Sequence, residues 1–225
     1  THPRGRILKG LDWLLDLMFP PKCPFCGNIL DKPRDPACPQ CQKLLPWLTG
    51  ERARRDVDFT AGCWSPLAYQ GRAVQGVRRY KFPGNPAYAR PLGVLVAQCV
   101  QDSGEKVDLV TWAPLSRQRR RRRGFDQGEK LARVVAAELG LPVRGMLRKV
   151  RNTQPQSGLE DPAARRANAL GAYAPAPGAQ GNGLRILLVD DVVTSGATLS
   201  ECARVLLGAG AGEVVCATVA QARKK

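Results

Sequence analysis

The sequence predicts an α/β fold, a doubly wound and mostly parallel sheet, with a small cysteine module before it. Apolar strand patterns at 185–189 and 213–220 flank a helical pattern at 198–207. Apolar strands alternating with helices in this order indicate a parallel sheet covered on both faces. Near the N-terminus, two CxxC pairs stand in a proline-rich, charged segment that is too poor in apolar residues to bury a core.

The N-terminal elements follow from their spacing. Residues 1–19 are predicted to form an amphipathic packing helix, because Asp12 and Asp16 share one face and the leucines fall on the other. Pro20 and Pro21 would end this helix. We expect two domains, the helix and cysteine module at 1–50 and an α/β domain at 51–225.

The remaining elements are predicted from apolar periodicity and from the residues that end it. The polar segment 150–183, rich in Pro, Gly, Asn and Arg, is too long for a passive connection. The predicted order is a strand-like stretch at 59–69, helices at 71–80 and 86–100, a strand at 107–112, and a helix at 125–139 with Gly140 as its C-cap.

Charge and composition limit the function. The formal net charge of +16 favours an anionic partner, whether a phosphorylated small molecule, nucleic acid or a membrane surface. His2 is the only histidine, so serine hydrolases with a histidine base and HExxH metalloproteases are excluded. No apolar run reaches the length of a transmembrane helix, so we expect no membrane insertion. Four scattered cysteines without common spacing indicate a reduced, cytoplasmic protein.

Two CxxC pairs separated by a short loop are typical of a structural zinc site, in which metal binding supplies the folding energy that this segment lacks. A redox motif, an iron–sulfur site and two disulfides are the alternatives. A redox CxxC normally occurs singly and at a helix start. A zinc module of this kind either contacts nucleic acid or only fixes a terminus. The predicted zinc ligands are Cys23, Cys26, Cys38 and Cys41.

The most specific segment, residues 185–198, is a buried strand that ends in Asp190 and Asp191 before a small-residue turn opens a helix. Parallel sheets place ligands at this edge, and backbone N–H groups at a helix start can hold a phosphate. The carboxylates suit a ligand with hydroxyls near its phosphate. Neither GxxxxGK[ST] nor GxGxxG is present, and a response-regulator pocket would lie mid-domain. The predicted 5-phosphate residues are Thr194, Ser195, Gly196, Ala197 and Thr198.

This segment resembles the phosphoribosyl-diphosphate (PRPP) signature of type I phosphoribosyltransferases, and the whole chain is similar to the ComF family. The resemblance runs from the helix before Cys23 through the residues RGFDQ at 123–127 to the last strand. The family usually has Asn where this chain has Asp126. The resemblance implies a type I phosphoribosyltransferase fold, with Asp190 and Asp191 as catalytic residues that hold the ribose hydroxyls.

The resemblance also implies a pyrophosphate loop at 113–117 and a flexible hood at about 150–183 that closes over PRPP. Mg²⁺ would bind with PRPP and, with arginines, stabilise the leaving pyrophosphate. The candidate pyrophosphate and lid residues are Ser116, Arg117, Arg148 and Lys149. The arginine run is either a solvated or nucleic-acid-binding face or a contact to pyrophosphate, and its residues are Arg119, Arg120, Arg121, Arg122 and Arg123.

Two classes of function follow. The first is a PRPP-binding protein associated with competence and DNA uptake, transferring or sensing the phosphoribosyl group, and a glycosyltransferase of unknown acceptor if it is an enzyme. The second is a single-stranded DNA-binding factor of the DNA-uptake machinery, in which the PRPP site is regulatory or vestigial. A scarcity of aromatic residues weakens base stacking as a mode of DNA binding. A zinc-stapled adaptor that binds neither ligand is a third reading. Neither the acceptor nor the oligomeric state follows from the sequence.

Overall fold

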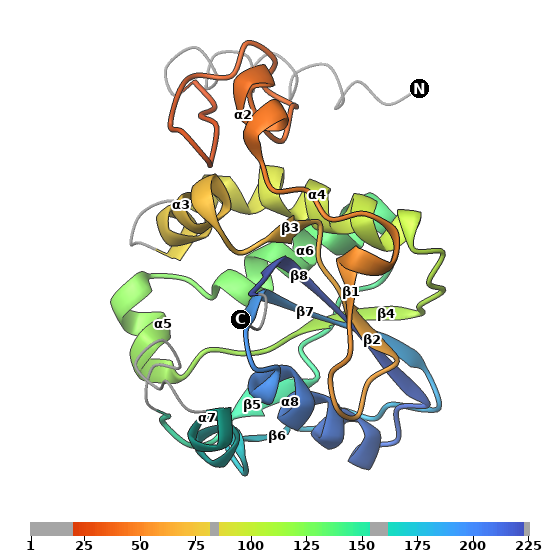
Figure 1. The fold of residues 1–225 in the computed structure, drawn as a ribbon. Coiled ribbons are helices and arrows are strands. Elements are labelled where there is room, and N and C mark those ends of the chain that lie inside the picture. The colour runs from red at the N-terminus through yellow and green to blue at the C-terminus, as the bar shows by residue number, and fades with distance from the viewer. Residues whose placement is uncertain (1–19, 82–85, 154–161, 223–225) are drawn as a thin grey trace, which may run out of the picture.

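The computed structural model describes residues 20–81, 86–153 and 162–222. The helix predicted at 1–19 lies outside the described residues. In chain order the described elements (Figure 1) are α2 Pro39–Leu44, η1 Gly50–Ala53, β1 Arg54–Arg55, β2 Gly62–Trp64, β3 Leu67–Ala68, α3 Gly71–Lys81, η2 Pro86–Tyr88, α4 Ala89–Asp102, β4 Leu109–Trp112, α5 Arg117–Arg123, α6 Gln127–Leu139, β5 Leu147–Lys149, α7 Pro162–Ala169, β6 Tyr173–Pro175, β7 Arg185–Val193, α8 Ala197–Gly208 and β8 Glu213–Gln221.

The main sheet has the order β1-β2-β8-β7-β4, and β3 pairs with β8 further along the edge that β2 begins. All its pairings are parallel except β1 with β2. Strands β5 and β6 form a separate antiparallel pair. The sheet therefore confirms the predicted mostly parallel fold.

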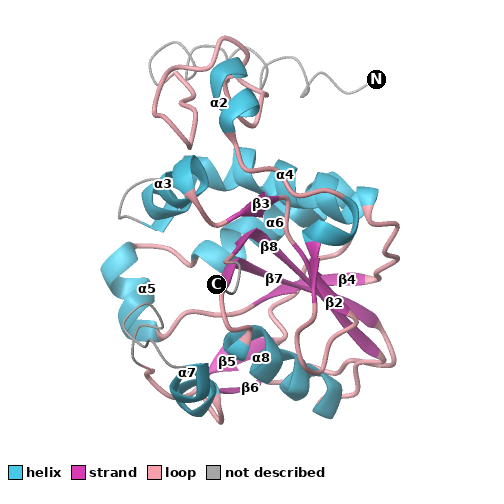
Figure 2. Cartoon of the chain, viewed as in Figure 1, coloured by secondary structure: helices cyan, strands magenta, loops and turns pink. Residues whose placement is uncertain are grey.

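Helices cover both faces of the sheet, with α3, α4 and α6 on one face and α8 on the other (Figure 2). The side chains of strand β7 alternate between the two faces of the sheet, so that each face carries apolar side chains for helices to cover. Leu187 belongs to the core under α4 and α6, whereas Ile186 and Leu188 belong to the core under α8. No helix in the described part of the chain is long and apolar enough to cross a membrane.

Several predicted boundaries change in the structure. The stretch 59–69 forms two short strands, β2 and β3, because Pro66 between them lacks the N–H that a ladder needs. Strand β7 continues past both aspartates to Val193, because β8 still pairs with it at Gln221. Asp190 and Asp191 therefore lie inside the strand and not beyond its end.

Helix ends depend on caps that the sequence partly reveals. Gly140 adopts the left-handed conformation predicted for the C-cap of α6. That helix begins at Gln127 rather than at 125, because Asp126 is its N-cap. Helix α5 had no predicted structure, yet Ser116 and the left-handed Gly124 cap its two ends. The polar segment 150–183 also contains regular structure, helix α7 and strand β6.

The cysteine module shares a core with the α/β domain. Phe25, which is fully buried, lies against Gly76 of α3, and a Cβ at Gly76 would stand 2.6 Å from the ring atom Cδ1. Arg79 of the same helix donates a hydrogen bond to the Pro24 carbonyl at 3.2 Å. Close approach of the module to α3 therefore requires a glycine at position 76. The division at residue 50 stays a prediction.

We predict that Gly76→Ala destabilises the protein, although alanine favours helix more than glycine. The new methyl group overlaps a buried ring, and overpacking of this kind costs about 1–3 kcal/mol, which exceeds the gain in helix propensity of up to about 1 kcal/mol. Gly208→Ala in α8 is the matched control, because nothing lies within 4 Å of its added Cβ. Denaturant unfolding should show a lower midpoint for Gly76→Ala alone. Equal midpoints for the two variants would show that Phe25 does not constrain α3.

Candidate functional site

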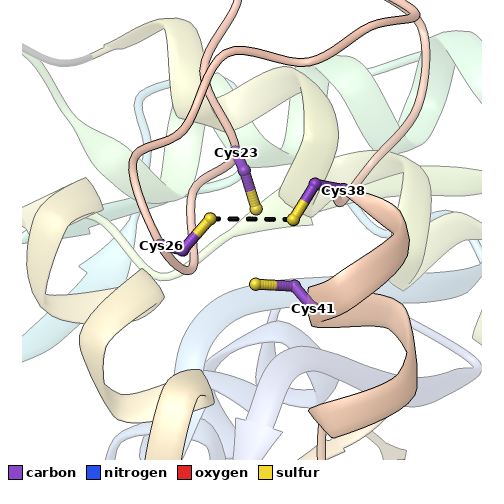
Figure 3. Close-up of side chains that lie close together, drawn as sticks. All are labelled: Cys23, Cys26, Cys38 and Cys41. Carbon is purple, nitrogen blue, oxygen red and sulfur yellow. Dashed lines mark hydrogen bonds between the residues drawn. The ribbon is translucent and has the colours of Figure 1, made fainter.

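The four cysteines of the two CxxC pairs form one cluster (Figure 3). Their sulfur atoms all lie within 4.8 Å of one another, and the Sγ atoms of Cys26 and Cys38 are 3.6 Å apart. Four Zn–S bonds of about 2.3 Å in a tetrahedron need sulfurs about 3.8 Å apart. All four are free thiols, three of them buried, so the cluster has the spacing and ligand chemistry of a structural zinc site.

Backbone turns and one cation shape this cluster. Gly27 has a φ of 87°, and its N–H donates to the Cys23 carbonyl at 2.8 Å, which closes the first knuckle. Cys38 is the N-cap of α2, and Cys41 lies in the first turn. Arg72 of α3 donates to the Cys41 sulfur at 3.0 Å, a contact that the sequence did not predict. Because four thiolates around Zn²⁺ carry net negative charge, a neighbouring guanidinium stabilises them.

The predicted phosphate turn connects β7 to α8. Gly196 is the N-cap of α8 with a φ of 81°, in the left-handed region that favours glycine. The Ser195 hydroxyl accepts a hydrogen bond from the Ala197 N–H at 3.4 Å. The first N–H groups of a helix have no partner within it, and the helix dipole adds positive potential there. The structure thus brings the residues of 194–198 to one helix start at the sheet edge.

The carboxylate pair precedes this turn. Asp191 forms an ion pair with Lys81, the last residue of α3, with Nζ and Oδ1 2.8 Å apart. The Asp190 side chain accepts a hydrogen bond from the Asp191 N–H at 2.8 Å. Burial, and then the charge of Asp191, raise the pKa of Asp190 to about 7. Lys81 therefore pairs with Asp191, whereas burial favours the protonated form of Asp190.

Lys81 is a site residue that sequence reasoning missed. It lies 110 residues before Asp191 and belongs to a helix whose pattern indicated only packing. The neighbouring Tyr80 is fully buried and donates to the Gln127 carbonyl at 2.6 Å, which fixes this end of α3 against α6. The only sequence signal was the cationic last turn of the helix.

Of the predicted pyrophosphate loop 113–117, residues 113–116 connect β4 to α5, and Arg117 is the first residue of α5. Ser116 is buried and accepts the Arg119 N–H as the N-cap of α5, whereas Arg117 is exposed. Asp126 accepts the N–H of Leu115 at 2.9 Å as well as capping α6. Burial raises the pKa of Asp126. This aspartate therefore holds the loop to α6 with both carboxylate oxygens, one accepting the Leu115 N–H and the other the Glu129 N–H.

The structure separates Arg148 from Lys149, because successive residues of strand β5 point to opposite faces. Arg148 is exposed and donates to the Pro175 carbonyl. Lys149 donates to the Tyr173 hydroxyl at 3.1 Å and lies 4.8 Å from the centre of that ring. Burial, and then the charge of Arg119, lower the pKa of Lys149 to about 8. Only Lys149 of this pair faces the interior.

The side chains of the arginine run at 119–123 also divide into an inward-facing group and an exposed group. Arg119 donates to the Thr153 carbonyl at 2.8 Å, and Arg123 donates to the Gln127 side-chain carbonyl at 2.9 Å. The side chains of Arg120, Arg121 and Arg122 are exposed. Arg117, the first residue of the helix, is exposed as well, so α5 presents four cations to solvent and directs two toward the domain.

Comparison with known proteins agrees with this architecture. Residues 126–225 match the phosphoribosyl transferase domain family, and residues 14–55 match the double zinc ribbon domain family. These matches and the sheet order identify a type I phosphoribosyltransferase-like fold with an N-terminal zinc ribbon. Glutamine PRPP amidotransferase from B. subtilis is similar to 63% of this chain, over 30% of its own, with 23% identity and a TM-score of 0.43. A likeness of that degree does not assign a function.

Two curated relatives match most of the chain. The DNA utilization protein YhgH of Salmonella typhimurium is 33% identical over 85% of this chain and 80% of its own length. Competence protein F of Haemophilus influenzae is 26% identical over 86% of this chain and 93% of its own. Because one relative shares a third of its residues across nearly the whole chain, and both matched domains occur in the expected order, this chain belongs to the ComF family.

Proposed function

We infer that this chain binds PRPP and transfers or senses its phosphoribosyl group, with an unidentified acceptor, in the use or uptake of DNA. The observation that carries this proposal is the β7–α8 junction, where two aspartates precede a left-handed Gly196 at a helix start. The 5-phosphate would bind the turn at 194–198, and the carboxylates would accept hydrogen bonds from the ribose hydroxyls. The names of the two relatives supply the link to DNA.

The cations around the carboxylate pair suit the diphosphate part of the ligand. Lys81 contacts Asp191, and Lys149 and Arg119 line the interior side of β5 and α5. Lys149 and Arg119 would meet the charge that accumulates on a departing pyrophosphate, while Lys81 balances the charge of Asp191. Mg²⁺ bound with the diphosphate would neutralise further charge, with carboxylate oxygens as ligands of the kind that it prefers.

The two aspartates would play different parts in the reaction. Positive charge develops at the anomeric carbon as the diphosphate leaves, and an ionised carboxylate nearby stabilises it. Asp191 would stay paired with Lys81. Asp190, whose pKa is raised to about 7, can release or hold a proton at physiological pH. The proposed role of Asp190 is therefore sensitive to small changes in pH or in local charge.

A second candidate function, binding of single-stranded DNA, is favoured by the exposed cations of α5. Arg120, Arg121 and Arg122 face solvent on consecutive positions of one short helix. Such a surface suits phosphate groups without base readout. In this reading the PRPP site is regulatory or vestigial.

One crossed experiment tests both candidates. Calorimetry with Mg²⁺ should show micromolar binding of PRPP by the wild type. Asp190→Asn/Asp191→Asn should weaken it about tenfold or more, because each substitution removes the negative charge and one of the two acceptor oxygens of the side chain. Asp31→Asn/Asp102→Asn removes the same charge at exposed positions and should leave affinity unchanged. If both pairs behave alike, the carboxylate pair is not a ligand site.

The second arm measures single-stranded DNA. Arg120→Glu/Arg121→Glu/Arg122→Glu should abolish DNA binding and spare PRPP, whereas the control Arg78→Glu/Lys106→Glu/Arg144→Glu changes the same charge at other exposed positions. Three lost phosphate contacts should reduce the slope of log affinity against log salt by about 2. DNA binding that survives in the α5 variant would remove this helix from the interface.

The protonation of Asp190 gives a prediction that needs no ligand. Its pKa is raised from about 3.9 in an unfolded chain to about 7 in the folded one. The folded state therefore binds the proton more tightly, and this group's contribution to stability falls as pH rises from about 4 to about 7. The stability of Asp190→Asn relative to wild type should rise across that window and level off above it. Parallel pH profiles for the two proteins would contradict this assignment.

The zinc module should stabilise the fold and take no part in catalysis. Purified protein should hold about one zinc per chain, and Cys41→Ser should lose it together with about 3 kcal/mol or more of unfolding free energy. Cys99→Ser replaces a buried cysteine outside the cluster and should keep the metal. Less than half an equivalent of zinc in the wild type would overturn the metal assignment.

A further inference from the structure

A largely apolar pocket of about 680 Å³ lies between the end of the cysteine module and helix α4, and we call it the tryptophan pocket. Its walls come from the segment that joins α2 to η1, from η1 and β2, and from the C-terminal part of α4. The described residues that line it include none of those assigned above to the phosphoribosyl site. Its large apolar side chains are Trp47, Leu48, Trp64 and Leu95.

Both tryptophans of this pocket are held by hydrogen bonds from their indole nitrogens. The Trp47 Nε1–H donates to the Gln42 carbonyl at 2.7 Å, and the Trp64 Nε1–H donates to Glu105 Oε1 at 3.1 Å. The polar edge of each ring is therefore used within the chain, and the rings offer a ligand apolar surface and π faces. Trp47 is 38% exposed although its side chain is among the largest apolar ones. Rings that are already fixed bind a ligand at low entropic cost.

The charges at this pocket have the opposite sign to the charge of the chain as a whole. The formal net charge of the chain is +16, yet the charged residues among the described lining residues are two acids, Glu51 and Asp102. Both side chains are exposed, so their carboxylates lie at the mouth of the pocket. Carboxylates attract a cation and repel a phosphate or a carboxylate, and the face of an indole ring also attracts a cation.

The Asp102 side of the pocket lies far from the phosphate turn. Asp102 is the last residue of α4, and three residues later Glu105 forms an ion pair with Arg185, the first residue of β7. The phosphate turn follows the other end of the same strand, and a strand of nine residues spans roughly 26 Å. A ligand in the tryptophan pocket therefore occupies a site separate from the proposed phosphoribosyl site.

The size and the lining of the pocket indicate what it takes. Its volume lies in the range of small-molecule sites, which are usually apolar inside with a few polar groups that fix the orientation of the ligand. A flat apolar body would contact the indole rings, and a positively charged amino group would lie at the acidic mouth. Nucleotides and DNA strands carry the wrong charge for this mouth.

We propose that the tryptophan pocket binds a free aromatic amine, with its ring against Trp47 and Trp64 and its ammonium group toward Glu51 and Asp102. The pocket is a second site of the chain. It does not depend on the function proposed above, and no reaction is assigned to it.

Three probes that differ in charge test this site, namely 2-phenylethylamine, 2-phenylethanol and 3-phenylpropionate. They share a phenyl ring and a two-carbon chain, and ligand-observed NMR measures their affinities, which lie in the millimolar range for molecules this small. The cation should bind about tenfold more tightly than the anion. The net charge of the chain alone favours the anion, so a cation that binds no more tightly than the anion would overturn the proposal.

Two matched variants assign the charge preference to the mouth of the pocket. Glu51→Gln/Asp102→Asn should remove most of the preference for the cation and keep the affinity for the neutral alcohol, because both side chains are exposed and the apolar lining is unchanged. Asp31→Asn/Glu138→Gln removes the same charge at exposed positions elsewhere and should keep the preference. Equal losses in the two variants would show general electrostatic attraction and contradict the assignment.

Three further outcomes would overturn the proposal by naming another occupant or site. Displacement of phenylethylamine by PRPP would make the pocket part of the phosphoribosyl site. Displacement by a lower concentration of the peptide acetyl-Lys-Phe-amide would assign the pocket to a basic segment of a partner protein. An affinity for phenylethylamine that falls as the protein concentration rises would assign it to a second copy of this chain.

Discussion

Two carboxylates at consecutive positions of a largely buried strand need a balancing charge, and Lys81 supplies it to Asp191. Its Nζ lies 2.8 Å from Asp191, and Asp190 is left with a pKa near 7. An uncompensated charge in such a place costs several kcal/mol, so the ion pair is a condition for keeping both aspartates in the fold. The geometry of the proposed ribose site therefore depends on where α3 ends.

Helix α3 is held by the zinc ribbon as well as by α6, which Tyr80 contacts. Phe25 fills the space that Gly76 leaves open, Arg79 bonds to the Pro24 carbonyl, and Arg72 bonds to the Cys41 sulfur. The three contacts lie at successive positions along α3, whose last residue is Lys81. The zinc ribbon can thus help to fix a cation of the proposed site, because contacts along one face of a helix also position its last residue.

Local patterns predicted much of this molecule, and contacts distant in sequence account for the rest. The β7–turn–α8 unit and the two CxxC knuckles were predictable because their residues are neighbours in the chain. The extension of β7 through Asp190 was not, since it depends on pairing with β8. Lys81 was missed for the same reason, because its ion pair with Asp191 joins segments 110 residues apart.

Among the described residues, the three cations that the proposed site uses each have a hydrogen-bond or ion-pair partner. Lys81 bonds to Asp191, Arg119 to the Thr153 carbonyl, and Lys149 to the Tyr173 hydroxyl. A diphosphate that enters must exchange these bonds for its own, so only part of its electrostatic attraction appears as affinity. The hydrogen bonds that Arg119 and Lys149 donate to neutral oxygens are weaker than hydrogen bonds to a phosphate would be. The ion pair between Lys81 and Asp191 is not weaker than such a bond, because both of its groups are charged. Arg119 and Lys149 are therefore the cations that can turn to a ligand at low cost, and Lys81 stays with the aspartate whose charge it balances.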